Sequence, residues 1–121
     1  VTERKKNIQE KLRKIKKEGK NIVLFGAGHL SVAFLAMMEI SDLIDFVIDD
    51  NPNKSGMIMP IGGIKILGSE SLYSRKVDLC LLGLNPVNQP KVIAKHALFE
   101  KNGGLFSSIF PGTDLSIEKL I

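Results

Sequence analysis

The chain has 121 residues, of which 44% are hydrophobic and 25% are charged, and its formal net charge is +4. This composition predicts one globular domain with a single core and argues against intrinsic disorder. The lone cysteine excludes a disulfide scaffold. No apolar run approaches the roughly 20 residues of a membrane-spanning helix. The absence of an export signal favours a cytoplasmic protein.

Positive charge is concentrated at the start of the chain. Residues 1–20 hold nine of the 17 Lys and Arg residues and three of the 13 Asp and Glu residues, so the rest of the chain is mildly acidic. Ile8, Leu12 and Ile15 form one apolar stripe at helical spacing, and lysines crowd the turns before Gly19. We predict a basic linker helix over residues 1–20, with its stripe on a neighbouring surface. A nucleic-acid or anionic-membrane helix is the alternative, which the lack of interleaved aromatic residues disfavours.

From residue 21 the hydrophobic pattern alternates between strands and helices. Short apolar runs predict strands over residues 21–25, 43–49, 64–67, 77–83 and 105–110. Longer segments between them predict helices over residues 30–40, 69–75 and 90–101, and a last helical turn within 115–121. The alternation predicts an α/β fold over residues 21–121: a small Rossmann-like, doubly wound parallel sheet of about five strands.

The first predicted strand runs directly into a glycine turn. Gly26 and Gly28 flank Ala27, and glycines here let backbone N–H groups approach a phosphate at the start of the next helix. The ring of His29 is expected beside the same ligand. A dinucleotide fingerprint has a third glycine where this chain has Ser31. The turn therefore favours an anion or nucleotide site over a dinucleotide site. In the alternative interpretation, it is a tight turn that binds no ligand.

Polar residues also end the second and fourth predicted strands. Asp49 and Asp50 follow the glycine turn by about twenty residues, where nucleotide-binding folds place an acid that binds ribose hydroxyls. In the alternative interpretation, Asp50 and Asn51 only start the turn before Pro52. The loop after the fourth strand offers uncharged donors and acceptors for a base edge or a sugar hydroxyl, from Asn85, Asn88 and Gln89.

The remaining chemically interesting residues favour structural roles. We expect Cys80 to be buried in a strand, Met37 and Met38 to fill the core, and His96 to face solvent or lie at an edge of its helix. The two histidines and the cysteine form no metal-ligand pattern, and no catalytic triad or acid pair is visible. The sequence thus predicts a binding domain, without catalytic or metal-binding residues of its own.

Residues 43–56, LIDFVIDDNPNKSG, followed by GIKI at 63–66, resemble the C-terminal domain of S-adenosylmethionine-dependent sugar C-methyltransferases. In that family a glycine-containing turn precedes a strand that ends in D-x-N-P-x-K-x-G. The segments 77–82 and 103–106 also look like its last two strands, and a Lys-rich helix before the first strand is likewise similar. The motif positions matched here are Gly26, Asp49, Asn51, Pro52, Lys54 and Gly56.

The resemblance implies that S-adenosylmethionine and the catalytic residues belong to a preceding part of the enzyme, so that no cofactor is expected in this domain. It further implies that the domain binds a nucleotide-linked sugar and contacts the methyltransferase domain. A homo-oligomer is a further option, and neither nucleic acid nor membrane is expected as a partner. The residues expected to contact the nucleotide sugar are Gly26, Ala27, Gly28, His29, Ser31, Asp49, Asp50, Asn51 and Asn85.

Two alternatives from other functional classes remain open. The N-terminal nucleotide-sugar-binding domain of sugar acyltransferases has a similar G-A-G turn and I-D-D-N-P strand end, and normally precedes hexapeptide repeats. The other alternative is a small NAD-binding or redox-sensing module. Such a module binds a dinucleotide, and Ser31, which stands in place of the third glycine of the fingerprint, disfavours this function.

Overall fold

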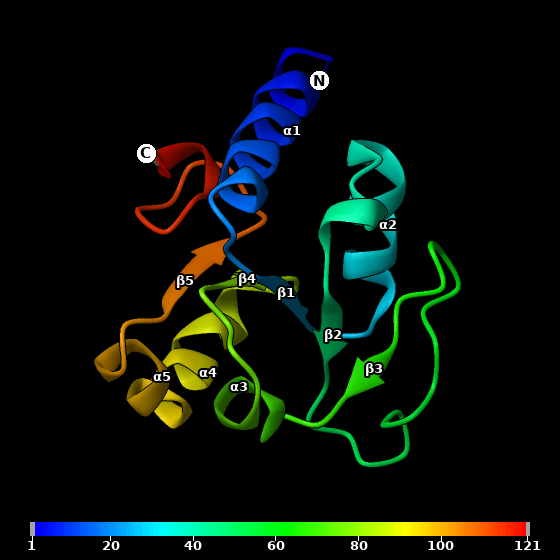
Figure 1. Cartoon of the computed structure of the whole chain (residues 1–121), viewed down its shortest axis with the longest axis vertical. Coiled ribbons are helices and arrows are strands. Elements are labelled where there is room, and N and C mark those ends of the chain that lie inside the picture. Colours follow the sequence, from blue (N-terminus) through cyan, green and yellow to red (C-terminus); the bar gives the residue numbers. More distant parts are fainter. Residues whose placement is uncertain (1, 121) are drawn as a thin grey trace.

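The computed structural model describes residues 2–120 as an all-parallel sheet with helices on both faces (Figure 1). The strands are β1 (Ile22–Phe25), β2 (Phe46–Ile48), β3 (Ile66–Leu67), β4 (Leu79–Leu82) and β5 (Leu105–Ser108). Their spatial order is β3-β2-β1-β4-β5, so the chain starts in the middle of the sheet, winds to one edge and then crosses to the other. This arrangement confirms the predicted doubly wound, Rossmann-like fold.

Each face of the sheet has its own core and its own helices. The helices are α1 (Thr2–Lys17), α2 (His29–Met38), α3 (Ser71–Ser74), α4 (Gln89–Lys95) and α5 (Ala97–Lys101), with 3-10 turns at Ser41–Leu43, Pro86–Asn88 and Ile117–Lys119. Side chains alternate along β1. Ile22 and Leu24 join the core under α1 and α2, whereas Val23 and Phe25 join the core under α3, α4 and α5. All four residues of β1 are buried, as expected for the central strand of a parallel sheet.

An apolar stripe and ion pairs dock α1 on this domain. Ile8 and Leu12 are fully buried in the same core as β1 and α2, and Ile15 packs against it, so the predicted stripe is confirmed. The C-terminal segment runs beside α1 (Figure 1), and Lys11 donates to the carbonyl of Glu118 at 2.8 Å. Ion pairs join α1 to acids of the body at Arg4–Glu118, Lys5–Glu39, Arg13–Asp42 and Lys16–Asp45. The basic charge of the helix is thus matched to an acidic surface. The division of the chain at residue 20 stays a prediction.

The helix predicted over residues 90–101 is two helices, α4 and α5, which meet at His96. Its φ of −112° and ψ of 35° depart from helical values. The side chain turns inward: His96 is only 5% exposed, and its ring lies 5.7 Å from that of Phe25, measured between centroids. The expectation that His96 faces solvent or lies at an edge is therefore wrong. The helix break, which periodicity does not reveal, rotates the ring into the core.

Among residues expected in the core, Cys80 and Met38 are buried. Burial raises the pKa of the Cys80 thiol, which is therefore neutral. Met37 is 56% exposed, so its assignment to the core is wrong. Adjacent helical residues point about 100° apart, and the narrow buried face of α2 admits only the second methionine. Within residues 2–120, no helix combines the length and apolar character needed to cross a membrane.

Candidate functional site

A cavity of about 430 Å³ lies at the carboxyl ends of β1, β2 and β4. Its wall is built from the turn after β1, the loop after β2 and the loop after β4. In open α/β sheets, ligands bind at this edge where the strand order reverses direction. The predicted site residues that line the cavity are Gly26, Gly28, His29, Asp49, Asp50 and Asn85. The other lining residues are Phe25, Leu30, Lys54, Gly83, Leu84 and Asn88.

The two glycines of the turn have different functions. Gly26 has a φ of +108°, and a Cβ atom there would lie 2.9 Å from the carbonyl oxygen of Gly83. Only glycine fits that backbone conformation and that close approach to the neighbouring loop. Gly28 has an ordinary φ of −96°, and a Cβ atom there would meet nothing within 4 Å. Gly28 thus leaves open space on the cavity wall.

The first backbone N–H groups of α2 lie beside this open space and have no hydrogen-bond acceptor within residues 2–120. α2 begins at His29, and its N-cap residue Gly28 has no side chain to cap it. The first N–H groups of a helix have no partner within the helix, and the helix dipole gives them a partial positive charge. An anion in the cavity can accept hydrogen bonds from these amides.

Asp49 joins the glycine turn to the loop after β2. Its Oδ2 accepts a hydrogen bond from the N–H of Ala27 at 2.8 Å, and its Oδ1 accepts one from the N–H of Asn51 at 2.8 Å. Each carboxylate oxygen therefore already binds the backbone. The structure gives Asp49 a clear role in shaping the site, and ribose binding by this side chain stays a prediction.

Asp50 lies at the rim of the cavity and forms an ion pair with Lys95 of α4, with 3.2 Å between Nζ and Oδ2. Partial burial disfavours the charged form, but hydrogen bonds from Ser69 and Lys95 outweigh this effect and lower the pKa of Asp50. The carboxylate is charged at neutral pH and is able to accept hydrogen bonds from sugar hydroxyls.

Lys54 reaches the cavity because the loop after β2 folds back on itself. The Oδ1 of Asn51 accepts a hydrogen bond from the N–H of Asn53, and the carbonyl of Asn51 accepts one from the N–H of Lys54, both at 3.0 Å. The Nζ of Lys54 then lies 3.3 Å from the carbonyl oxygen of Ala27. In the sequence, Lys54 stands out only as a motif position. Its place on the cavity wall follows from this Asx-type turn.

Ala27, Ser31 and Asn51 are predicted site residues that do not line the cavity. Ser31 is fully buried, and its hydroxyl donates to the carbonyl of Gly83 at 3.2 Å. A Cβ atom at Gly83 would collide with this hydroxyl, so Ser31 occupies the place where α2 packs closely against the sheet. Ala27 and Asn51 contribute the backbone N–H groups that Asp49 binds.

The loop after β4 is stabilised by two amide side chains. The Oδ1 of Asn85 accepts from the N–H of Val87 at 3.0 Å and caps the 3-10 turn Pro86–Asn88. The Nε2 of the buried Gln89 donates to the carbonyl of Leu84 and to the hydroxyl of Ser108, both at 3.0 Å. Gln89 therefore ties this wall of the cavity to the end of β5, a supporting role that the sequence pattern does not indicate.

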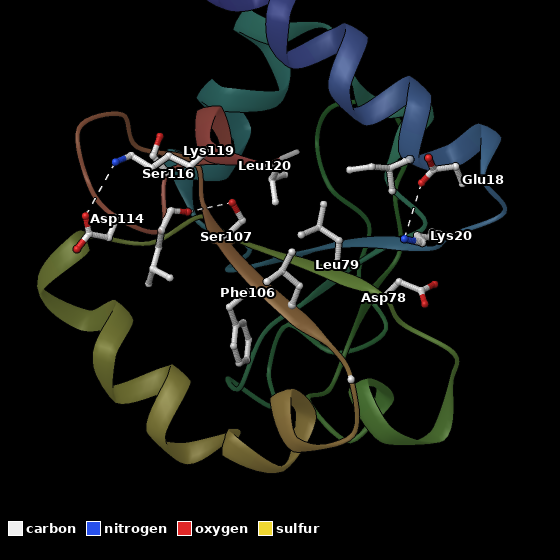
Figure 2. Close-up of a pocket in the computed structure, with 14 residues that line it drawn as sticks. Glu18, Lys20, Asp78, Leu79, Phe106, Ser107, Asp114, Ser116, Lys119 and Leu120 are labelled. Atoms are coloured by element: carbon white, nitrogen blue, oxygen red, sulfur yellow. Dashed lines mark hydrogen bonds and ion pairs between the residues drawn. The ribbon is translucent and has the colours of Figure 1, made fainter.

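A larger cavity, of about 630 Å³, lies along the outer edge of β5 (Figure 2). Leu79 lies in its centre, whereas the ring of Phe106 points away from it and packs against Phe99 in the core of the other face. The ion pair between Glu18 and Lys20 lies on one side of the cavity, and Lys119 lies on the other. None of the predicted site residues lines it. Its charged groups are spread along the rim, and it contains neither the glycine turn nor the start of α2, so we place the candidate site at the glycine turn. Within residues 2–120, no group of three His, Cys, Asp or Glu side chains is arranged to hold a metal ion.

Comparison with known proteins supports a family assignment and the fold. The family described as C-methyltransferase C-terminal domain matches residues 1–111 of the chain. No curated protein matches significantly. The crystal structure of UDP-D-quinovosamine 4-dehydrogenase from Vibrio fischeri is similar, with a TM-score of 0.57 and 22% identity over 84% of this chain and 91% of that chain.

RSP, a Rex-family repressor, has the same fold. Its complex with β-NADH has a TM-score of 0.54 and 18% identity over 84% of this chain and 55% of RSP. Its complex with β-NAD⁺ and operator DNA has a TM-score of 0.51 and 16% identity over 80% of this chain and 48% of RSP. The chain thus spans about half the length of RSP. At these identities the likeness shows a Rossmann-like fold.

Proposed function

The chain belongs to the family of C-methyltransferase C-terminal domains, and we propose that it binds the nucleotide of a nucleotide-linked sugar for such an enzyme. The observation that carries this proposal is the cavity at the carboxyl ends of β1, β2 and β4, between the start of α2 and Lys54. There, backbone amides and an ammonium group face the same space, a combination suited to a diphosphate.

The other lining residues suit the remaining parts of a nucleotide. Asp50 is an ionised acceptor at the end of β2, the place where ribose hydroxyls are bound in related folds. Asn85 and Asn88 offer uncharged donors and acceptors for a base or a sugar, and Leu30 and Leu84 offer apolar contact. The similar fold of an enzyme named for a UDP-sugar supports the same ligand class.

In this proposal, S-adenosylmethionine and the methyl-transfer chemistry belong to another part of the enzyme, and the methyltransferase domain is the protein partner of this chain. Family membership favours this function over the acyltransferase alternative. An NAD-binding role is the second candidate, because RSP binds β-NADH on the same fold. The buried contact between Ser31 and Gly83 fills the position of the third glycine in a dinucleotide fingerprint, which counts against it.

Thermal unfolding of the 121-residue chain with UDP, dTDP, NAD or S-adenosylmethionine tests the proposal. A ligand that binds the folded state stabilises it by about 2.7 kcal/mol at a hundredfold excess over Kd. We expect UDP or dTDP to raise the unfolding midpoint and S-adenosylmethionine to leave it unchanged. A rise with NAD alone supports the second candidate, and a rise with S-adenosylmethionine contradicts the division of labour proposed here.

A further inference from the structure

We infer that Lys54 is the specificity-determining residue that makes this site prefer a nucleoside diphosphate to a nucleoside monophosphate. This inference rests on the proposed function and adds the group that recognises the second phosphate. Two observations support it: the charge partners of the groups on the cavity wall, and the contact by which the loop after β2 holds Lys54 at the glycine turn.

The other charged groups of the wall already have partners. The two carboxylate oxygens of Asp49 bind the N–H groups of Ala27 and Asn51, and Asp50 pairs with Lys95. Lys54 differs, because no carboxylate of residues 2–120 lies within 4.0 Å of its Nζ. Its ammonium group donates to a neutral carbonyl, that of Ala27. The positive charge of Lys54 is therefore not neutralised by a protein carboxylate and remains available to an anion.

The ammonium group of Lys54 is held by the backbone of Ala27, the same residue that Asp49 binds. Ala27 is bound through its N–H by Asp49 and through its carbonyl by Lys54. Three successive turn hydrogen bonds order the chain up to the lysine: the N–H of Asn51 donates to Asp49, and the N–H groups of Asn53 and Lys54 both donate to Asn51. The ammonium group is thus held at the glycine turn by an ordered loop.

The cavity wall therefore holds two kinds of positive group, the first amides of α2 and the ammonium group of Lys54. The first amides of α2 carry a partial positive charge and suit one phosphate group. A second phosphate adds negative charge that these amides alone do not balance, and Lys54 is the neighbouring full positive charge on the wall. Removing the charge of Lys54 should weaken binding of a diphosphate more than binding of a monophosphate. A lysine that only clamps Ala27 should affect both ligands equally.

Two variants of Lys54 separate charge from hydrogen bonding. Lys54→Gln keeps a side-chain donor for the carbonyl of Ala27 but removes the charge, and Lys54→Arg keeps the charge. Lys65 is a matched control, since it is an exposed lysine of the segment between β2 and β3 that does not line the cavity. Lys65→Gln removes the same net charge outside the site.

The experiment is calorimetric titration of UDP and UMP into the 121-residue chain and these variants, with circular dichroism to verify folding. We expect Lys54→Gln to weaken UDP binding by about tenfold, UMP binding to change by less than about twofold, and Lys54→Arg and Lys65→Gln to retain the wild-type ratio. An unchanged ratio of the two Kd values in folded Lys54→Gln overturns the inference alone. If wild type binds neither UDP nor UMP, the same comparison is made with dTDP and dTMP, and absence of binding of all four nucleotides overturns the proposed function and the inference with it.

Discussion

The carboxylate of Asp49 binds the backbone N–H of Ala27, 22 residues away in sequence, at 2.8 Å. This contact joins the turn after β1 to the loop after β2 and fixes the edge of the sheet where the cavity opens. Lys54 contacts the carbonyl of the same alanine, so two residues of the loop determine the position of the glycine turn. Asp49 and Lys54 thus join the loop after β2 to the glycine turn.

Replacing Asp49 by asparagine should destabilise both the turn and the loop. An asparagine amide has one oxygen, so one of the two backbone N–H groups loses its acceptor and faces an NH₂ group instead. We expect the free energy of unfolding to fall by about 1–3 kcal/mol and UDP affinity to fall with it. Urea denaturation measures the first effect and calorimetry the second. The exposed Asp114→Asn provides the control, with a change below about 0.5 kcal/mol.

The two glycines of the turn should respond differently to the same substitution. Gly26→Ala places a Cβ atom 2.9 Å from the carbonyl of Gly83 at a φ of +108°, so we expect a loss of about 1–3 kcal/mol of stability. Gly28→Ala meets no neighbour within 4 Å and should leave the unfolding midpoint nearly unchanged. Because Gly28 lines the cavity, a bulkier Gly28→Val should still weaken nucleotide binding. Equal destabilisation by both alanine variants contradicts this assignment.

The buried His96 should make stability depend on pH. Its Nδ1 lies 3.0 Å from the hydroxyl of Tyr73, whereas its buried Nε2 has no partner among the described residues. Burial lowers the pKa of His96 below the ordinary 6.5, Asp50 opposes this effect and Lys95 adds to it. A group with a lowered folded-state pKa contributes stability above its unfolded-state pKa and loses it as the pH falls.

We therefore expect the free energy of unfolding of the wild type to fall as the pH decreases below 6.5, and His96→Phe to flatten this dependence. Phenylalanine keeps a ring against Phe25 but carries no titrating nitrogen. Urea denaturation at a series of pH values measures the slope, with the exposed His29→Asn as control. Asp50 and Glu118 also have lowered pKa values, and their contributions to stability are lost as the pH falls through and below their ordinary values of 3.8 and 4.5, so the slopes are compared between pH 4.5 and 6.5. An unaltered slope in His96→Phe is the contrary result.

Burial of α1, more than its ion pairs, should secure it to the sheet. Leu12 is fully buried, so Leu12→Ala should cost about 2–5 kcal/mol. Arg13 pairs with Asp42 at an exposed position, and Arg13→Ala should cost less than about 1 kcal/mol. Denaturation in low and high salt measures both variants, and only the small effect of Arg13→Ala should depend on salt. A larger loss from Arg13→Ala than from Leu12→Ala would show that charge docks the helix.

The sequence predicts most of the fold because its strands are continuous apolar runs and its glycines stop them. The stripe of Ile8 and Leu12 likewise predicts the buried face of α1. What the pattern misses depends on tertiary contacts. The inward ring of His96 follows from a helix break, and the exposed Met37 follows from a narrow buried face.

The candidate site is predictable in position but not in the roles of its members. Glycine and acidic residues after β1 and β2 locate the edge of the sheet, since carboxyl ends of parallel strands meet there. The sequence does not show that Ser31 packs against Gly83 or that Asp49 binds Ala27. The contribution of Lys54 depends on a loop whose path is set by hydrogen bonds between side chains and backbone.

Mapping of backbone amide chemical shifts during a UDP titration tests the central proposal most directly. We expect the largest changes at Gly28, His29 and Leu30, because these residues line the cavity at the start of α2. Further changes are expected at Lys54, which lines the cavity from the loop after β2. Changes confined to Phe106 and the other residues around the cavity at β5 would contradict it, as would the absence of any change at saturating nucleotide.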